Sequence, residues 1–369
     1  MRVLVTGLST YWGGRLAQQL EQDDDVETII GIDRTPPKVE LERTEFVQVA
    51  DAHSLIRRIV QGAEIDTVID TRLVVDSTVT SPRRAHENNV VGTMNILAAC
   101  SGADSCVERF VFKSSSHYYG CEQDDPAFFT EEMERPHPPR TRIEKDIVEA
   151  EQLVADFAHS SQRTKVCVLR FGNGLGAGIR TAYTRLLRLP AVPAILGFDP
   201  RWQFVHEDDI VGALVHAARN EDMDGIYNGA ADGVLVLSEI ADLLNKPLAP
   251  ILPPWGTALA ARGLKQVGID IPDEILRHLR FGRGLDNRKL KATGFRFRYT
   301  TRETVEKMRE AMRLEPILKT GQSPYRYERE VEDFLRYSPS VRSDRRREPK
   351  RQNVARGEPR RELTEKTHG

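Results

Sequence analysis

Short runs of apolar, often β-branched residues recur through the first half of the chain. They lie at residues 2–6, 27–33, 45–51, 66–70, 109–114 and 164–171. Stretches with helical periodicity separate them, at 14–21, 53–61, 82–101 and 142–158. Strands that are apolar throughout are typical of a parallel sheet covered by helices on both faces. The pattern therefore predicts an α/β fold with a Rossmann-type doubly wound parallel sheet, in which ligands bind beyond the carboxyl ends of the strands.

The pattern changes in the second half of the chain. Prolines become frequent, and helical patterns lie at 207–219, 237–245, 257–267, 272–281 and 302–313. We interpret residues 1–172 as the sheet domain, to which 203–230 return, and 173–335 mainly as a smaller C-terminal lobe. Residues 336–369 are rich in Lys and Arg and contain few large apolar residues. Such a segment cannot bury enough apolar surface to fold, so we predict a disordered basic tail.

Composition and charge narrow the class of protein. The chain has 369 residues and a formal net charge of −2, which gives no general attraction to nucleic acid or to a membrane surface. No apolar run reaches the ~18 residues that a membrane helix needs. The four cysteines show no metal-binding spacing, and a strand that starts at residue 2 leaves no place for a signal peptide. We therefore expect a cytoplasmic protein without a metal site, a nucleic-acid partner or a membrane contact.

The segment TGLSTYWGG (6–14) follows the first predicted strand and opens the first predicted helix. Gly7 and Gly13 fit a G-x-x-G-x-x-G pattern whose middle position is Thr10. Glycines there let the backbone turn tightly and approach a pyrophosphate, which the helix N-terminus then binds. The Thr10 side chain would crowd that approach, although its hydroxyl can also donate to a phosphate. The context of strand, loop and helix predicts a dinucleotide-binding loop.

Asp33 ends the second predicted strand, twenty residues beyond Gly13. A carboxylate at this place accepts hydrogen bonds from the adenosine ribose hydroxyls and repels a 2′-phosphate. Arg34 is the next residue, and an arginine can pair with that phosphate. The pattern favours NAD over NADP and leaves NADP as the alternative.

These segments and others follow one another in the order of a known family. They are TGLSTYWGG (6–14), Asp33, Asp51, ENNVVGT (87–93), KSSSHYYG (113–120), LRFGNGLG (169–176), QFVHEDDIVGAL (203–214), GIYNGA (225–230) and LKATGFRFRYTTRETV (290–305). Over about residues 1–315 the chain resembles the extended short-chain dehydrogenase/reductase family, in its NAD-dependent epimerase/dehydratase branch. It looks most similar to UDP-glucose 4-epimerases. The order of the segments is more specific than any one of them.

The resemblance implies that residues 1–172 bind NAD and that the C-terminal lobe binds a nucleotide sugar or another small-molecule substrate. Tyr11 and Trp12 then belong to the loop that holds the pyrophosphate, and Asn89 supports the active-site helix. The implied cofactor-binding set is Gly7, Thr10, Tyr11, Trp12, Gly13, Asp33, Arg34, Asp51, Ala52, Thr71, Asn89 and Lys145. Asn173, Arg201 and His206 match positions that line the substrate pocket. A homodimer through the helices at 82–101 and 142–158 is also implied.

The catalytic residues are only partly matched. Enzymes of this kind use a serine, a tyrosine base and a lysine four residues after the tyrosine, which puts the last two on one helical face. Ser115 matches the serine and Lys145 the lysine, but Thr141 stands at the base position. An aliphatic hydroxyl is a far weaker acid than a phenol, so Thr141 cannot simply replace the tyrosine. His117 is a possible substitute.

Three interpretations of the missing tyrosine stay open. Another residue such as His117 serves as base, the reaction does not need that base, or the protein binds its ligands without turnover. The first hypothesis is an NAD-dependent epimerase/dehydratase-like oxidoreductase acting on a nucleotide sugar. The alternatives are a non-catalytic regulatory or scaffold protein that binds NAD or a nucleotide sugar, and a reductase of a hydrophobic alcohol or ketone, to which the apolar stretch 255–276 would give entrance.

Overall fold

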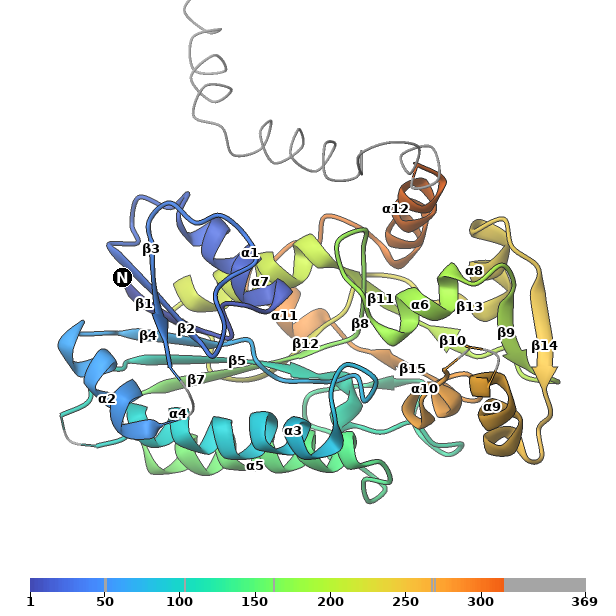
Figure 1. Ribbon diagram of the computed structural model, residues 1–369, viewed down its shortest axis with the longest axis horizontal. Helices are drawn as coiled ribbons and strands as arrows, with labels where there is room; N and C mark the ends of the chain where they lie inside the picture. The colour runs from blue at the N-terminus through green and yellow to red at the C-terminus, as the bar shows by residue number, and fades with distance from the viewer. Residues whose placement is uncertain (50–51, 103, 162, 267, 269, 315–369) are drawn as a thin grey trace, which may run out of the picture. The chain divides into compact units, whose positions relative to one another are not determined.

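The computed structural model describes residues 1–49, 52–102, 104–161, 163–266, 268 and 270–314. Its largest element is a seven-stranded sheet of order β12-β7-β5-β4-β1-β2-β3, and every neighbouring pair in it is parallel (Figure 1). The strands are β1 (Arg2–Thr6), β2 (Thr28–Asp33), β3 (Thr44–Gln48), β4 (Thr67–Asp70), β5 (Arg109–Ser115), β7 (Lys165–Phe171) and β12 (Gly225–Gly229). The predicted doubly wound α/β sheet is confirmed. The order reverses direction at β1 and β4, so a ligand crevice is expected beyond their carboxyl ends.

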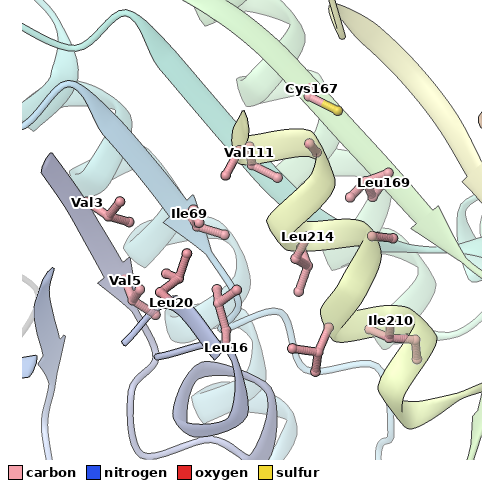
Figure 2. Packing of buried hydrophobic residues seen from close by; sticks show 14 of the residues in the cluster. Val3, Val5, Leu16, Leu20, Ile69, Val111, Cys167, Leu169, Ile210 and Leu214 are labelled. Carbon is pink, nitrogen blue, oxygen red and sulfur yellow. The ribbon is translucent and has the colours of Figure 1, made fainter. Parts of the chain in front are cut away.

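Helices cover both faces of this sheet (Figure 1). α1 (Tyr11–Leu20) and α7 (Glu207–Arg219) pack on one face, where Val3, Val111 and Leu169 from the sheet meet side chains of both helices (Figure 2). α2 (His53–Gly62), α4 (Gly92–Cys100) and α5 (Arg142–Ser160) pack on the other face. The segment 203–230 thus supplies one covering helix and the edge strand β12.

The helix predicted at 82–101 is not a single regular helix. α3 (Pro82–His86) passes into a π-helical turn, η1 (Glu87–Val91), before α4 begins. In that turn the buried Asn89 side chain accepts a hydrogen bond from Val74 N at 2.8 Å and donates one to Val74 O at 2.8 Å. The turn therefore ties the helix to the loop after β4, next to the expected crevice.

The second half forms small sheets and helices around its own core. Its elements are β6 (Phe128–Phe129), β8 (Asn173–Leu175), α6 (Ala182–Arg188), β9 (Val192–Ile195), β10 (Arg201–Trp202), β11 (Phe204–His206), β13 (Leu235–Val236), α8 (Leu237–Leu243), β14 (Leu248–Leu252), α9 (Thr257–Gln266), α10 (Asp273–His278), β15 (Gly282–Leu285), α11 (Arg288–Ala292) and α12 (Thr301–Leu314). β6 pairs with β15 in a four-stranded sheet, which joins the loop after β5 to this lobe. The KSSSHYYG segment (113–120) spans the end of β5 and the start of that loop, so it lies where the two halves meet.

The predicted basic tail, 336–369, and the end of the predicted lobe up to residue 335 lie outside the described residues. Within the described ranges, none of the helices has both the length and the apolar character needed to cross a membrane.

Candidate cofactor and active site

The glycine loop joins β1 to α1 with the geometry expected of a dinucleotide-binding loop. Gly7 has φ +80°, a conformation that favours glycine, and a side chain at Gly13 would overlap the carbonyl oxygen of Gly7. Thr10 is the N-cap of α1, and its Oγ1 accepts a hydrogen bond from Gly13 N at 3.0 Å and donates to Gly7 O at 2.7 Å. The Thr10 hydroxyl therefore closes the loop from within. The amides of Tyr11 and Trp12 precede Gly13 in the first turn of α1, where a helix can bind a phosphate.

Asp33 lies at the end of β2, beside this loop. Its carboxylate accepts hydrogen bonds from Ser9 N at 2.9 Å and Ser9 Oγ at 2.7 Å, and from Arg34 N at 2.6 Å. These contacts hold the carboxylate in place, and a carboxylate has further lone pairs with which to accept ribose hydroxyls. The Arg34 side chain is exposed. The residues present thus fit the adenosine half of NAD.

The structure says less about Ala52 and Asp51, two other residues of the implied cofactor-binding set. Ala52 is half-buried and stands at the start of α2 without a side-chain cap. Asp51 lies outside the described residues.

A buried ion pair lies at the carboxyl end of β4. Asp70 is 1% exposed and accepts hydrogen bonds from Thr6 Oγ1 at 2.8 Å and from Arg72 Nε and Nη2 at 3.1 and 2.9 Å. The stem of Arg72 passes over the loop, because a Cβ on Gly7 would lie 2.6 Å from Arg72 Cγ. Thr71 donates to Thr6 O at 2.9 Å and lies 3.4 Å from the Thr10 hydroxyl. Arg72 is therefore placed between the glycine loop and the π-helical turn, at the centre of the crevice.

Lys113 is a second cation at this end of the sheet, and sequence reasoning missed it. The residue is on β5, is 4% exposed, and its Nζ lies 5.1 Å from the ring centroid of Trp12, in the first turn of α1. Burial lowers the pKa of its ammonium to about 8, and the charge of Asp70 opposes this only in part. A lysine directly after the apolar run 110–112, inside a predicted buried strand, was the available signal.

Ser115 and His117 form a hydrogen-bonded pair at the end of β5. Ser115 Oγ lies 2.8 Å from His117 Nδ1, and both residues are buried. Burial, followed by the charges of Arg283 and Arg135, lowers the pKa of His117 to about 3, so its imidazole is neutral. His117 Nε2 is buried without a hydrogen-bond partner in the described part of the chain. The pair therefore has an unused hydrogen-bonding atom that a bound polar ligand can satisfy.

The start of α5 requires a correction to the sequence-based assignment. Thr141 is the N-cap of this helix, where its side chain accepts a hydrogen bond from Glu144 N at 3.2 Å. Lys145 is exposed to solvent. The side chains that face the sheet from the first turns, with a spacing of four, are Ile143 and Ile147, which are 3% and 0% exposed. Lys145 is rotated about 200° from Ile143 around the helix axis, so it points away from Ser115 and from the cofactor crevice.

The substrate positions divide into two groups. Asn173 is buried on β8, its Nδ2 donates to Gln203 O at 3.3 Å, and its Oδ1 has no partner in the described part of the chain. Arg201 is exposed on β10 and lines a cavity of about 350 Å³ together with Arg283. His206 instead caps α7, because its Nδ1 accepts from Asp208 N at 3.2 Å.

Further buried polar atoms without partners lie on the same side of the molecule. Tyr183 on α6 and His278 on α10 pack edge to face, with ring centroids 5.3 Å apart. Among the described residues, neither the Tyr183 hydroxyl nor either ring nitrogen of His278 has a hydrogen-bond partner. Arg283 lowers the pKa of His117 and of His278 after burial, which places it near both imidazoles. A polar ligand would supply the hydrogen bonds that these buried atoms lack.

The comparisons with known proteins agree with this geometry. The sequence model of the NAD dependent epimerase/dehydratase family matches residues 3–230. An uncharacterized protein of Mycobacterium tuberculosis is 31% identical over 323 residues, which are 86% of this chain and 85% of that protein. A UDP-glucose 4-epimerase of Erwinia amylovora is 26% identical over 188 residues, which are 48% of this chain and 54% of the epimerase.

Solved structures share the fold at lower identity. The UDP-glucose 4-epimerase of Thermotoga maritima, solved with UDP-glucose, has a TM-score of 0.65 and 20% identity, and the match covers 85% of this chain and 99% of that one. The UDP-glucuronic acid 4-epimerase of Bacillus cereus, solved with UDP-glucuronic acid and NAD, has a TM-score of 0.64 and 16% identity, with the same coverage. These similarities extend across both halves of the described chain.

Proposed function

Because the chain belongs to the NAD-dependent epimerase/dehydratase family, we propose that it is an NAD-dependent oxidoreductase of a nucleotide sugar with an atypical active site. The observation that carries the substrate class is a set of buried polar atoms without partners in the described part of the chain, one of them on His117 beside Ser115. His117 Nε2, Asn173 Oδ1 and the Tyr183 hydroxyl need hydrogen bonds that a sugar's hydroxyl groups can supply. A hydrophobic alcohol or ketone would leave most of them unsatisfied.

The chain's own residues would bind and orient the cofactor. The glycine loop and the N-terminus of α1 would hold its pyrophosphate, and Asp33 the adenosine ribose. NAD, when bound, supplies the acceptor for a hydride from the carbon that carries the reacting hydroxyl. Asn89 would keep the loop after β4 in position beside it, through its two hydrogen bonds to Val74.

Proton transfer would rest on the pair of Ser115 and His117. As the reacting hydroxyl gives its proton to Ser115 Oγ, the serine proton would pass to His117 Nδ1, which lies 2.8 Å away. A neutral imidazole can accept that proton. Burial holds its pKa at about 3, so the imidazolium is disfavoured, and we expect slow turnover.

A second candidate function has a specific observation in its favour. Ile143 and Ile147 occupy the positions from which a base and a lysine on α5 would face the crevice. A protein with these side chains could bind NAD and a nucleotide sugar without turnover, as a sensor or scaffold. The two candidates share the ligands and differ in hydride transfer.

The first experiment is mass spectrometry of the small molecules released when the freshly purified protein is denatured. NAD together with a nucleotide sugar is expected, and a protein that releases neither and gains no thermal stability from either would contradict the proposal. NADP alone would show that Arg34 outweighs Asp33.

The absorbance of the bound nicotinamide, which reports its reduction, then distinguishes the enzyme from the sensor or scaffold. His117→Gln and Ser115→Ala should each abolish it, while Lys145→Met, an exposed control, should not. Absence of reduction with every sugar nucleotide that binds would leave the sensor as the function.

A further inference from the structure

The inward-facing side of α5, where the family resemblance predicts a lysine, carries no cation among the described residues. A buried lysine lies on β5 instead. Ile147 occupies the inward-facing position of the helix, and Lys145 points to solvent. On β5, by contrast, Lys113 is almost fully buried, two residues before Ser115. Because side chains in a strand alternate, Lys113 and Ser115 lie on the same face, the face that also bears Val111 and the helix α1.

The surroundings of Lys113 leave its charge unbalanced. Asp70 acts on it, but the carboxylate of Asp70 is already bonded to Arg72 and to Thr6. The remaining neighbour with a defined contact is the Trp12 ring. No residue in the described part of the chain accepts a hydrogen bond from Lys113 Nζ. An ammonium buried in this way costs free energy unless something pairs with it.

The other charged groups on this face are engaged elsewhere. Glu207, at the start of α7, accepts hydrogen bonds from Gly178 N at 3.1 Å and from the Tyr11 hydroxyl. Arg15 of α1 lies 3.8 Å from Asp208 of α7. Among the described residues, Asp70 is the carboxylate that acts on Lys113, and it is already bonded to Arg72. The N-terminus of α1 adds partial positive charge beside them. The site therefore suits an anion that reaches the carboxyl ends of β4 and β5.

We propose that Lys113 is a ligand of the bound dinucleotide, and that its ammonium, presented from β5 beside Ser115, replaces the lysine that the fold otherwise carries on α5. The inference rests on the proposed function, because it requires that NAD binds. It adds a residue that neither the glycine loop nor the α5 helix supplies. The Trp12 ring contacts the ammonium from the first turn of α1, and Asp70 acts on its charge.

The test is calorimetric titration of NAD into the full chain and into three variants. Lys113→Met keeps the apolar stem and removes the charge, so it should weaken binding about tenfold or more at about pH 7. Lys113→Arg keeps a charge and should retain most of the affinity. Lys145→Met is the matched control and should bind as the unchanged protein does. Thermal denaturation confirms that each variant is folded.

The pH dependence gives a second readout that a merely structural lysine would not move. NAD affinity of the unchanged protein should fall above about pH 8, as Lys113 loses its proton, whereas Lys113→Met and Lys113→Arg should show no such fall up to about pH 10. If Lys113→Met binds NAD with unchanged affinity and the same pH profile, Lys113 is not a ligand, although the proposed function stands. If the unchanged protein fails to bind NAD, the proposed function fails, and this inference with it.

Discussion

Lys113→Met should stabilise the protein in the absence of ligand. Burial lowers the pKa of Lys113 from 10.5 to about 8. One pKa unit corresponds to about 1.4 kcal/mol, so the charged ammonium costs the folded state about 3 kcal/mol at neutral pH. Methionine fills a similar volume, keeps the contact with the Trp12 ring, and carries no charge. Asp70 keeps its bonds to Arg72 and Thr6, so the substitution leaves no carboxylate unpaired.

The gain in the free energy of unfolding from Lys113→Met should decrease as the pH rises. Below about pH 8 Lys113 is charged in both the folded and the unfolded chain, so the full cost is present. Between about pH 8 and pH 10.5 the folded chain releases the proton and the unfolded chain keeps it, so the stability of the unchanged protein rises with pH. The difference between the variant and the unchanged protein should therefore shrink over this window.

Urea denaturation of both proteins, followed by circular dichroism at several pH values, measures this difference. Other groups titrate equally in both proteins and cancel. Lys145→Met, an exposed substitution, should change the free energy of unfolding by less than about 0.5 kcal/mol. The reasoning is refuted if Lys113→Met is no more stable than the unchanged protein at neutral pH, or if the difference between them stays constant from pH 7 to beyond about pH 10.

Two further predictions concern other buried groups. Glu151→Gln should lower the free energy of unfolding by about 3 kcal/mol or more, because the buried Arg170, bonded to Glu151 at 2.6 Å, would lose its counter-charge. Thermal denaturation measures this against the exposed control Glu149→Gln. Equal melting temperatures of the two variants would contradict it. Burial holds the pKa of His117 at about 3, so the unchanged protein should lose stability more steeply than His117→Gln as the pH falls from about 6.5 to 3. Parallel acid-unfolding curves of the two proteins would contradict a neutral, buried His117.

The fold was predictable because most strands of its sheet are buried on both faces, with the edge strand β3 only partly buried. Runs such as 2–6, 27–33 and 164–171 have apolar centres, and such runs, when helices alternate with them, are typical of a parallel sheet. The π-helical turn was not predictable, since it depends on Asn89 bridging to Val74, a contact between segments that periodicity does not reveal. The pairing of β6 with β15 was missed for the same reason, because strands of two to four residues give little pattern to detect.

The site was predictable where a motif fixes the backbone. The prediction failed where only a residue type was matched. Gly7 and Gly13 lie where the loop needs them, because both the turn and the close approach require glycine. Lys145 was assigned from the family resemblance, as a lysine at the start of the predicted helix, four residues after Thr141. The apolar positions 143, 147, 150 and 154 already marked the buried face of α5, however, and residue 145 lies opposite that face. Helical periodicity was thus available to reject the lysine.

The same use of periodicity points to Lys113. A strand buried on both faces gains stability from an apolar residue at every position, yet residue 113 of β5 carries a charge on the face that meets the glycine loop. A fold that needed only stability would place an apolar side chain there, because the ammonium costs free energy and no described residue accepts a hydrogen bond from it. The apolar inner face of α5 and the lysine on β5 concern the same end of the sheet. A dinucleotide bound at the carboxyl ends of β4 and β5 would account for the buried ammonium.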